Sequence, residues 1–581
     1  MNHFALILLL VPAAAFAAES SFTLPALSVT AKPSFETLRE ESLVPTTSIP
    51  IDASRSTLLD GLKWDTQFPL QNFGFPSGAN GVSLGGRSID DTQVTTLGVP
   101  LNQAIGGGAD LSAFPAFLWS DVRIAPTTTS AAFIQQSASG NLDLTPWSWS
   151  ALRSEIPSTT PSRLTASWDR DLQTVSIGTR KSEISILAGS TFGRQTGPSG
   201  SLSYRFLKTP VLSLSANVIG SDQKGDDPGS TLFPRPMGSK KTTRVIPSLM
   251  GQYGNSNGIR LQTTIFGDIQ RLEFTNPVFN TLDQTRSLGI ENVLVTGDTS
   301  FSVSARNVNF TNNSAGTYSE WPAHFGVTQG FNLPANIRLK ATGSAEYLSG
   351  YGLHPGARVS SEIPAHPGQS FFLEAQALAK LPSIQDRLYV SPADGYFGNP
   401  NVKPERVYAF IAGFEDKSSW IESKSQIKAE LRNNVILLKD DFSSVDNAGT
   451  AQFLSLSESA KAKLLPELQV KAQVLASYSR LAKTGNPYPR LPVVSAGGSI
   501  LLLPQDRLTF ETQAKWMGRS TEFNGASLPA FLLLGEKISF SATNEIQIHV
   551  GVDNLLDSRI EMIRGYPLPG RMVYASTEII F

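Results

Sequence analysis

The C-terminal stretch Arg571-Met-Val-Tyr-Ala-Ser-Thr-Glu-Ile-Ile-Phe581 alternates between two kinds of residue. One set is apolar and falls on a single face of a strand: Val573, Ala575, Ile579 and Phe581. The other set falls on the opposite face: Tyr574, Ser576 and Glu578. Because successive side chains of a strand point to opposite faces, one face suits lipid and the other suits water. The stretch predicts the last strand of a transmembrane β-barrel.

The same alternation continues backwards along the chain to about residue 160. Leu508, Phe510, Thr512, Ala514 and Trp516, for example, alternate with Thr509, Glu511, Gln513 and Lys515. Clusters of Gly, Pro, Asn, Asp and Ser separate these segments, which predicts a long series of β-hairpins. The alternative is a soluble β-sandwich, but a sandwich of this length would normally break into domains. Plugged outer-membrane barrels have about 22 strands, and we expect about 22 antiparallel strands here.

The N-terminal part of the chain has a different texture. Residues 18 to about 150 contain Gly-rich turns and little sustained alternation, which indicates a compact mixed α/β domain. A barrel of about 22 strands would be an open channel unless its lumen were filled. We therefore expect this domain to be a plug inside the barrel.

The first residues predict export. An apolar run, Phe4-Ala-Leu-Ile-Leu-Leu-Leu-Val11, precedes Ala15-Phe16-Ala17, a pattern that a signal peptidase cleaves. The run is shorter than the ~20 residues that span a bilayer as a helix. The predicted organisation is a signal peptide (1–17), a periplasmic segment (18–45), a plug (46–150) and an outer-membrane barrel (151–581).

Composition excludes several classes of function. The chain has no cysteine, which rules out disulfides, cysteine zinc sites and thiol nucleophiles. A formal net charge of −1 gives no reason to expect a nucleic-acid partner. The five histidines show no metal-ligand spacing and no catalytic motif stands out, so we expect neither an enzyme nor a required cofactor.

In order along the chain, Leu27–Ala31, the stretches between Val82 and Leu144, and Phe397–Glu405 resemble the TonB-dependent receptor family of plugged outer-membrane barrels. The strongest is Phe397-Gly-Asn-Pro-Asn-Val-Lys-Pro-Glu405, preceded by Leu381-Pro-Ser-Ile384; its Pro and Asn spacing predicts a rigid turn entering a strand. The plug match comprises Val82–Val94, Leu97–Asn102, Asp121–Ile124 and Ser139–Leu144. A further match, to the family's last two strands and the turn between them, comprises Asp553–Asp557 and Gly565–Arg571.

The resemblance implies active uptake of a scarce nutrient, with outer-membrane lipid around the barrel and a TonB-type energy-transducing protein as the periplasmic partner. A short extended stretch resembles the TonB box, which would pair as an added strand with that protein: Leu27, Ser28, Val29, Thr30 and Ala31. The chain departs from the family's plug arginines and acidic turn at Gly85, Leu97, Pro126 and Thr127. Those departures leave a second hypothesis open, a passive or purely binding barrel such as a porin, adhesin or phage receptor.

The ligand is predicted to bind where plug and loops meet. The flexible apex of the plug is expected at Asn102, Gln103, Gly106, Gly107 and Gly108, because this part faces the ligand in the family. The small size and the acidic loop at 220–228 resemble cobalamin (vitamin B12) receptors, with a ferric siderophore or other metal chelate as the alternative. In such loops Asp222, Asp226 and Asp227 would hold a structural calcium ion, the alternative being a solvated turn.

Overall fold

The computed structural model describes sixteen stretches of the chain: residues 42–52, 55, 57–65, 70–72, 80–84, 88–125, 140–146, 163–168, 172–180, 184–193, 195–209, 211–232, 234–235, 237–254, 258–391 and 395–580. The predicted signal peptide, the stretch Leu27–Ala31, and Gly85, Pro126 and Thr127 lie outside the described residues. No helix in the described part of the chain is long and apolar enough to cross a membrane.

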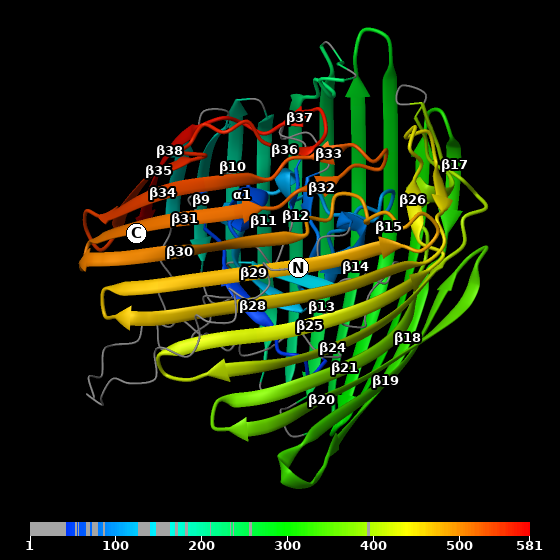
Figure 1. Cartoon of the computed structure of the whole chain (residues 1–581), viewed down its shortest axis with the longest axis horizontal. Coiled ribbons are helices and arrows are strands. Elements are labelled where there is room, and N and C mark those ends of the chain that lie inside the picture. Colours follow the sequence, from blue (N-terminus) through cyan, green and yellow to red (C-terminus); the bar gives the residue numbers. More distant parts are fainter. Residues whose placement is uncertain are drawn as a thin grey trace.

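Most of the described chain forms one closed antiparallel barrel (Figure 1). Its strand elements are β8 (Arg163–Trp168), β9 (Leu172–Arg180), β10 (Ile184–Gly193), β11 (Gln195–Lys208), β12 (Leu212–Asp226), β13 (Ser239–Gly254), β14 (Arg260–Thr275), β15 (Asn280–Thr296), β16 (Thr299–Asn312), β17 (Gly316–Glu320), β18 (Ala323–Asn332), β19 (Arg338–Leu348), β20 (Gly352–His366), β21 (Gln369–Lys380), β24 (Glu405–Lys417), β25 (Ile421–Asn433), β28 (Ala451–Leu465), β29 (Leu468–Leu481), β30 (Val494–Gln505), β31 (Leu508–Met517), β34 (Phe531–Ser541), β35 (Ile546–Asp553) and β38 (Met572–Ile580). The last of these pairs with the first, Ala575 lying opposite Trp168.

The described barrel has 22 strands. β17 and β18 both pair with β16, at consecutive positions, and therefore form one strand interrupted at Trp321 and Pro322. The remaining elements pair in sequence order around the ring. This confirms the predicted antiparallel barrel and its strand number.

The two faces of the wall follow the predicted alternation. In β38, Val573 points outward and is 47% exposed, whereas Tyr574 and Ser576 are buried on the inner face. In β21, Leu373 points outward while Glu374 is buried inside. Exposed apolar side chains recur at outward positions around the ring, among them Leu249, Ile269, Leu288, Val303, Phe325, Val359, Phe410, Leu456, Ile500, Ile538 and Val550. An outer apolar band and a polar interior are typical of transmembrane barrels.

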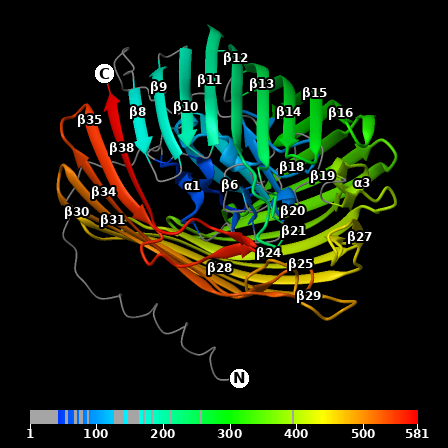
Figure 2. The ribbon, with the colours of Figure 1, turned by 90° about the horizontal axis from the view of Figure 1, so that it is seen from above.

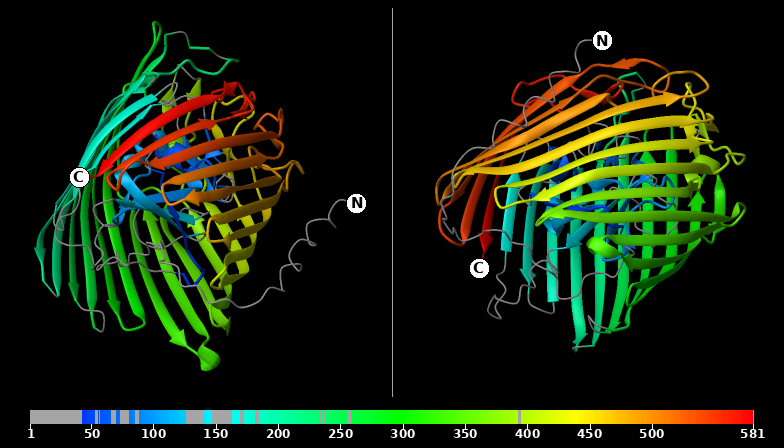
Figure 3. Two further views of the ribbon diagram at one scale, coloured as in Figure 1. Left: turned by 90° about the vertical axis from the view of Figure 1, so that its left-hand side faces the viewer. Right: turned by 60° about the horizontal axis from the view of Figure 1, so that its bottom comes forward.

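The N-terminal domain lies inside this ring: Figure 2 labels α1 and β6 within the barrel, and Figure 3 shows the blue part of the ribbon there. Its elements are β1 (Thr47–Pro50), α1 (Leu58–Leu62), β2 (Leu70–Gln71), β3 (Gly81–Val82), η3 (Ile89–Asp91), β4 (Thr92–Thr96), β5 (Val99–Pro100), η4 (Leu111–Ala113), η5 (Ala116–Leu118), β6 (Trp119–Ala125) and β7 (Gly140–Pro146). Five strands form a mixed sheet in the order β1-β6-β7-β4-β5, in which β4 and β7 are parallel. The predicted mixed α/β plug is confirmed.

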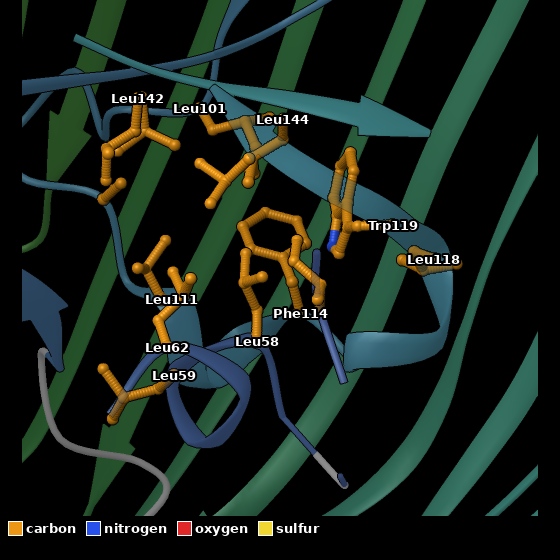
Figure 4. Packing of buried hydrophobic residues seen from close by; sticks show 14 of the residues in the cluster. Leu58, Leu59, Leu62, Leu101, Leu111, Phe114, Leu118, Trp119, Leu142 and Leu144 are labelled. Carbon is orange, nitrogen blue, oxygen red and sulfur yellow. The ribbon is translucent and has the colours of Figure 1, made fainter. Parts of the chain in front are cut away.

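The plug has an apolar core of its own (Figure 4). Leucines from α1, η4 and β7 surround Phe114 and Trp119, whose rings meet edge to face with centroids 6.2 Å apart. On one side the core continues into the barrel wall, at Ile219, Ile246 and Phe266 of β12–β14. The plug is therefore a packed domain with one apolar side against the wall.

The two ends of the barrel differ. At one end short turns connect the strands, for example residues 367–368, 466–467 and 506–507, with η6 (Pro334–Asn336) in another. At the other end lie six longer connections: 227–238, 381–404, 434–450, 482–493, 518–530 and 554–571. These carry α3 (Ile384–Arg387), β22 (Val390–Ser391), β23 (Tyr396–Phe397), β26 (Ile436–Leu438), β27 (Val445–Asn447), β32 (Ser520–Thr521), β33 (Ser527–Leu528), β36 (Glu561–Ile563) and β37 (Tyr566–Pro567). We call these the short-turn end and the long-loop end.

Candidate functional site: the plug docks and the long-loop mouth

Helix α1 is held against β29–β35, at a contact that we call the α1 dock. Thr57 caps the helix, its hydroxyl accepting the Asp60 amide at 3.2 Å. At the other end the helix carbonyls are satisfied by the barrel, because the Lys515 ammonium donates to the carbonyl oxygens of Lys63 (2.9 Å) and Asp65 (2.8 Å). A cation at this position also complements the helix dipole.

Ion pairs complete the α1 dock. Barrel lysines hold plug carboxylates: Lys471 with Asp65 at 2.9 Å, and Lys537 with Asp52 at 2.8 Å. One barrel carboxylate, Asp553, accepts Arg55 (2.7 Å) and Lys63 of the plug. Burial alone would lower the pKa of Arg55, but Asp553 and its neighbours outweigh it and raise that pKa. Arg55 therefore stays charged at every relevant pH.

A second contact, the η3 dock, joins the plug to β21–β25. Lys380 reaches both Asp90 and Asp91, at 2.6 Å each, and Arg432 reaches the second oxygen of Asp91 at 2.8 Å. Arg432 also contacts Glu405 at 3.3 Å and Glu430. Asp91 and Arg432 are fully buried. Removing one member of such a cluster would leave the others as uncompensated buried charges.

A third contact lies on β13 and β14. The Arg244 guanidinium donates to the Leu101 carbonyl at 2.6 Å and is held by Asp268 at 2.9 Å. Nearby, Leu97 and Gly98 form the turn between β4 and β5, and both have positive φ (51° and 79°). Such turns favour Asn, Asp or Gly, yet Leu97 is buried against Met250 of the barrel. Leu97, which departs from the family pattern, is thus a less favourable turn residue that gains an apolar contact with the barrel wall.

The docks place four plug carboxylates on barrel cations. The resemblance to the family implies the opposite arrangement, in which buried plug arginines pair with barrel carboxylates, and several of those arginines are missing from this sequence. Asp52, Asp65, Asp90 and Asp91 instead face Lys537, Lys471, Lys380 and Arg432, and only the Arg55 and Lys63 pair has the expected polarity. The adjacent Asp90-Asp91 pair, inside the quoted plug match, was the one sequence signal of this arrangement.

The predicted plug apex lies at the long-loop end, but most of it is covered. The Ile105 carbonyl accepts the Gln385 amide of α3 at 2.8 Å, and Ile105 packs with Val308, Phe310 and Ile384. The Asn102 side chain bonds within the plug, to the Val94 amide (2.7 Å) and to the carbonyls of Thr92 and Gly107. Gln103, Gly106, Gly107 and Gly108 complete the same loop, in which the Gly107 amide donates to the Gln103 carbonyl. Asn102 thus shapes the apex, and loop 381–404 covers it.

Loop 381–404 carries the strongest sequence motif, and the structure gives it a structural role. Ser383 and Asp386 form a capping box on α3. The Asn399 amide donates to the Asp386 carbonyl at 2.7 Å, and its side chain donates to the Val445 carbonyl of the next long loop. Burial, with Asp90 nearby, raises the pKa of Asp386. The motif therefore helps to position this loop over the plug, a placement that the predicted rigid turn did not include.

The long loops are linked into one ring of contacts. The Phe397 amide donates to the Ser443 carbonyl, and Phe442 meets Phe523 edge to face at 6.4 Å. Arg490 pairs with Glu522 at 2.9 Å and lies 4.9 Å from the Phe523 ring. Glu522 also accepts the Arg564 amide, and the Gly565 carbonyl accepts the Thr231 amide at 2.7 Å. These contacts join all six long loops.

Cations and phenols gather at this mouth. Burial raises the pKa of Tyr566, whereas Arg235 and Arg490 act on that pKa in the opposite direction, so each arginine lies within electrostatic reach of the Tyr566 hydroxyl. The ring centroids of Tyr389 and Tyr396, both in loop 381–404, lie 6.2 Å apart, and burial raises the pKa of each hydroxyl. Each of these groups already has a partner in the structure: Asp227 for Arg235, Glu522 for Arg490, Asp283 for Tyr389 and the Gln385 carbonyl for Tyr396. An anionic or oxygen-rich ligand would bind here by replacing one of these partners.

The structure does not bring the three predicted calcium ligands together. Asp222 lies on the outer face of β12 and pairs with Lys241 at 3.4 Å, and Asp226 is exposed at the end of that strand. Asp227 points inward to Arg235 at 3.7 Å and accepts the Gly229 amide. Among the residues that the structure describes, no group of three His, Asp or Glu side chains could hold a metal ion. The arrangement is that of a turn with paired carboxylates.

Comparisons with known proteins agree with this geometry at the level of fold. No protein-family model and no curated protein matches the sequence. Among solved structures, the siderophore receptor PirA of Acinetobacter baumannii superimposes with a TM-score of 0.76 at 12% identity, covering 93% of this chain and 98% of PirA. The ferric enterobactin receptor PfeA of Pseudomonas aeruginosa gives 0.74 at 13%, covering 92% and 99%.

The copper transporter OprC gives a TM-score of 0.76 at 11% identity, covering 92% of this chain and 99% of OprC. At such identities the likeness shows architecture. The barrel, the plug inside it and the order of the two domains all correspond. The chain therefore has the plugged-barrel fold of TonB-dependent outer-membrane receptors.

Proposed function

We propose that this chain is an outer-membrane receptor that imports a scarce ligand, powered by a TonB-type protein that pulls on the segment containing Leu27–Ala31. The observation that carries the proposal is a plug with an apolar core that fills a 22-strand barrel and is held there mainly by polar docks, with apolar wall contacts on β12–β14 and β16. Hydrogen bonds and ion pairs at the docks can be exchanged for hydrogen bonds to water, whereas no such exchange compensates for exposing an apolar core. The plug can therefore shift while its own core stays packed. The role is transport and not catalysis.

The proposed orientation follows from the barrel ends. Outer-membrane barrels have short periplasmic turns and longer extracellular loops. The long-loop end would therefore face outside, and the ligand would bind there between the coupled loops and the plug apex. The segment before β1 enters from the short-turn end, where a periplasmic protein can reach it.

For the ligand we propose a metal chelate with anionic or oxygen-rich groups. Arg235, Arg490 and Tyr566 at the mouth support it, because a guanidinium group that now holds a loop carboxylate can exchange it for an anionic oxygen of the ligand. The solved structures with the same fold include a siderophore receptor, a ferric enterobactin receptor and a copper transporter. Cobalamin, which chain size and the acidic loop favoured, is the alternative; the acidic loop supports it less now that its carboxylates point to opposite faces.

Energised uptake in cells tests the proposal. Uptake of a panel of radiolabelled ferric siderophores and of cobalamin would be compared between the intact chain, no chain, and the variant Val29→Pro, since proline cannot donate to an added strand. Thr37→Pro, outside the predicted coupling stretch, is the matched control. We expect uptake of one ligand that requires the chain, is lost in Val29→Pro and survives in Thr37→Pro.

Other outcomes are equally informative. Uptake that ignores both prolines would favour the passive or binding barrel. Uptake of cobalamin alone would keep the mechanism and replace the ligand. For a chelate, Arg490→Gln should raise the half-saturation concentration by about tenfold, the loss expected for one charge-assisted contact of ~1.4 kcal/mol, with little change in maximal rate.

A further inference from the structure

Residues 42–45, shortly before β1, lie along the inner wall of the barrel. Three polar contacts tie them to three strands: Ser42 Oγ to Glu374 Oε2 of β21, the Leu43 amide to Ser360 Oγ of β20 at 3.2 Å, and the Lys424 ammonium of β25 to the Pro45 carbonyl. The segment predicted as periplasmic thus ends inside the lumen. We call residues 42–45 the wall anchor.

Val44 forms the centre of the wall anchor. Its side chain is 2% exposed and packs between Phe372 of β21 and Ile411 of β24, which are both fully buried. The Phe372 ring lies over Gly413, where a Cβ atom would come within 2.3 Å of the ring. The wall around this pair is polar and charged, with Lys424 5.5 Å from the ring. Val44 therefore occupies an apolar socket in an otherwise polar wall.

The wall anchor is the first described contact that a pull from the N-terminus would meet. Phe372 is the fourth residue of β21 and Lys424 the fourth of β25, both counted from the short-turn end. After the anchor comes β1, the edge strand of the plug sheet, which pairs only with β6, over residues 47–50. The anchor is on β20–β25, whereas the α1 dock is on β29–β35. Tension on the segment must load the anchor before it reaches the plug.

We propose that the wall anchor is a release element: the Val44 socket holds the plug's leading segment at rest, and its rupture is the step that precedes peeling of β1 from β6. This rests on the proposed function, because it assumes a pull from the N-terminal side. Val44 and Phe372 act here as positioning residues, since neither lies at the ligand mouth. The anchor prevents thermal fluctuations of the N-terminal segment from disturbing the plug sheet, whereas a directed pull breaks the anchor and reaches the sheet.

Force spectroscopy on the full chain in a lipid bilayer, pulled through an N-terminal handle at constant force, tests the inference. The first extension step of the parent should be release of the anchor. Val44→Ala and Phe372→Ala should each shorten its lifetime by about tenfold, as removal of buried methyl groups implies, and the double variant should shorten it little more than either alone. Leu43→Ala, outside the socket, is the matched control and should leave the lifetime unchanged.

Thiol labelling gives a second readout, which is independent of the force measurement. The chain contains no cysteine, so Val44→Cys and Ser48→Cys each introduce the only thiol. Maleimide should label Cys at the exposed position 48 at least tenfold faster than at 44 in purified protein, and Phe372→Ala should abolish most of that difference. Equal labelling rates in the parent background, or a first rupture step insensitive to both socket variants, would overturn the proposal. Neither readout depends on uptake, so their failure is distinct from failure of the transport function.

Discussion

The interior of the plug and its boundary with the barrel are built from different interactions. Inside, leucines from α1, η4 and β7 pack around Phe114 and Trp119 with almost no exposed surface. At the boundary with β21–β35, charged groups meet in pairs and clusters. Within the described residues, apolar packing crosses from plug to wall mainly on β12–β14, with smaller contacts at Ile105 on β16 and at Val44 on β21 and β24. The difference indicates a domain that holds itself together more firmly than it holds the barrel, and whose β12–β14 side should detach last.

The largest effect should come from breaking the core. Trp119 is fully buried and is the largest such side chain in the described chain. Trp119→Ala should destabilise the plug by about 3–5 kcal/mol, the range for emptying a large aromatic site. Urea unfolding of the purified protein in detergent, followed by proteolysis of the plug, measures it. The barrel should stay intact, and a plug as stable as the parent's would contradict the picture of one cooperative core.

The next effect should come from the η3 dock. Arg432→Met keeps the length of the side chain but leaves Asp91, Glu405 and Glu430 without that cation, a loss of about 3 kcal/mol for a broken buried ion cluster. The loss should appear as a loosened plug and not as an unfolded one, because the core is untouched. Hydrogen exchange at 88–91 should rise, while β6 stays protected. An equal rise in hydrogen exchange at 88–91 and in β6 would contradict the distinction between core and dock.

A smaller effect is expected at the α1 dock. Lys515→Met removes the donor to the Lys63 and Asp65 carbonyls at the end of α1, at a cost of about 1–2 kcal/mol for unsatisfied buried acceptors. Lys461→Met, an exposed lysine of β28, is the control and should change nothing measurable. Exchange rates of the α1 amides distinguish the two variants.

The smallest effect concerns pH. Burial, with Asp90 nearby, raises the pKa of Asp386, so the folded state favours the neutral acid. Its contribution to stability is full below the unfolded pKa of about 3.9 and is lost as pH rises through the higher folded pKa. In Asp386→Asn the side chain is neutral at every pH and can still accept the hydrogen bond from the Ser383 amide. The variant should match the parent at acidic pH and exceed it at pH 7 by less than about 1 kcal/mol; a parent that is the more stable at pH 7 would refute the sign.

The barrel could be predicted because its rule is local. Each strand shows lipid-facing and lumen-facing residues in alternation, and Val573 against Tyr574 lie as that rule requires. The motif at 397–405 likewise specified a rigid turn from its own prolines and asparagines. Local sequence carries such features because neighbours in the chain make them.

The docks could not be predicted, because their partners are hundreds of residues apart. Asp65 meets Lys471 across 406 positions, and neither residue reveals the other. Resemblance to the family directed attention to missing arginines, and it gave no sign that Arg432 and Lys380 supply the charge from the barrel side. At Leu97 the expected acidic turn residue is replaced by an apolar wall contact with Met250, which only the folded chain shows.

Hydrogen exchange of the full-length protein with both η3-dock cations replaced, Lys380→Met together with Arg432→Met, tests the central claim most directly. If the plug is a self-contained body held by separable polar docks, amides at 88–91 should exchange at least tenfold faster while amides of β6 and η5 around Trp119 keep their protection. If the amides around Trp119 exchange as fast as those of the broken dock, the core depends on its docks, and a plug that shifts intact would be contradicted.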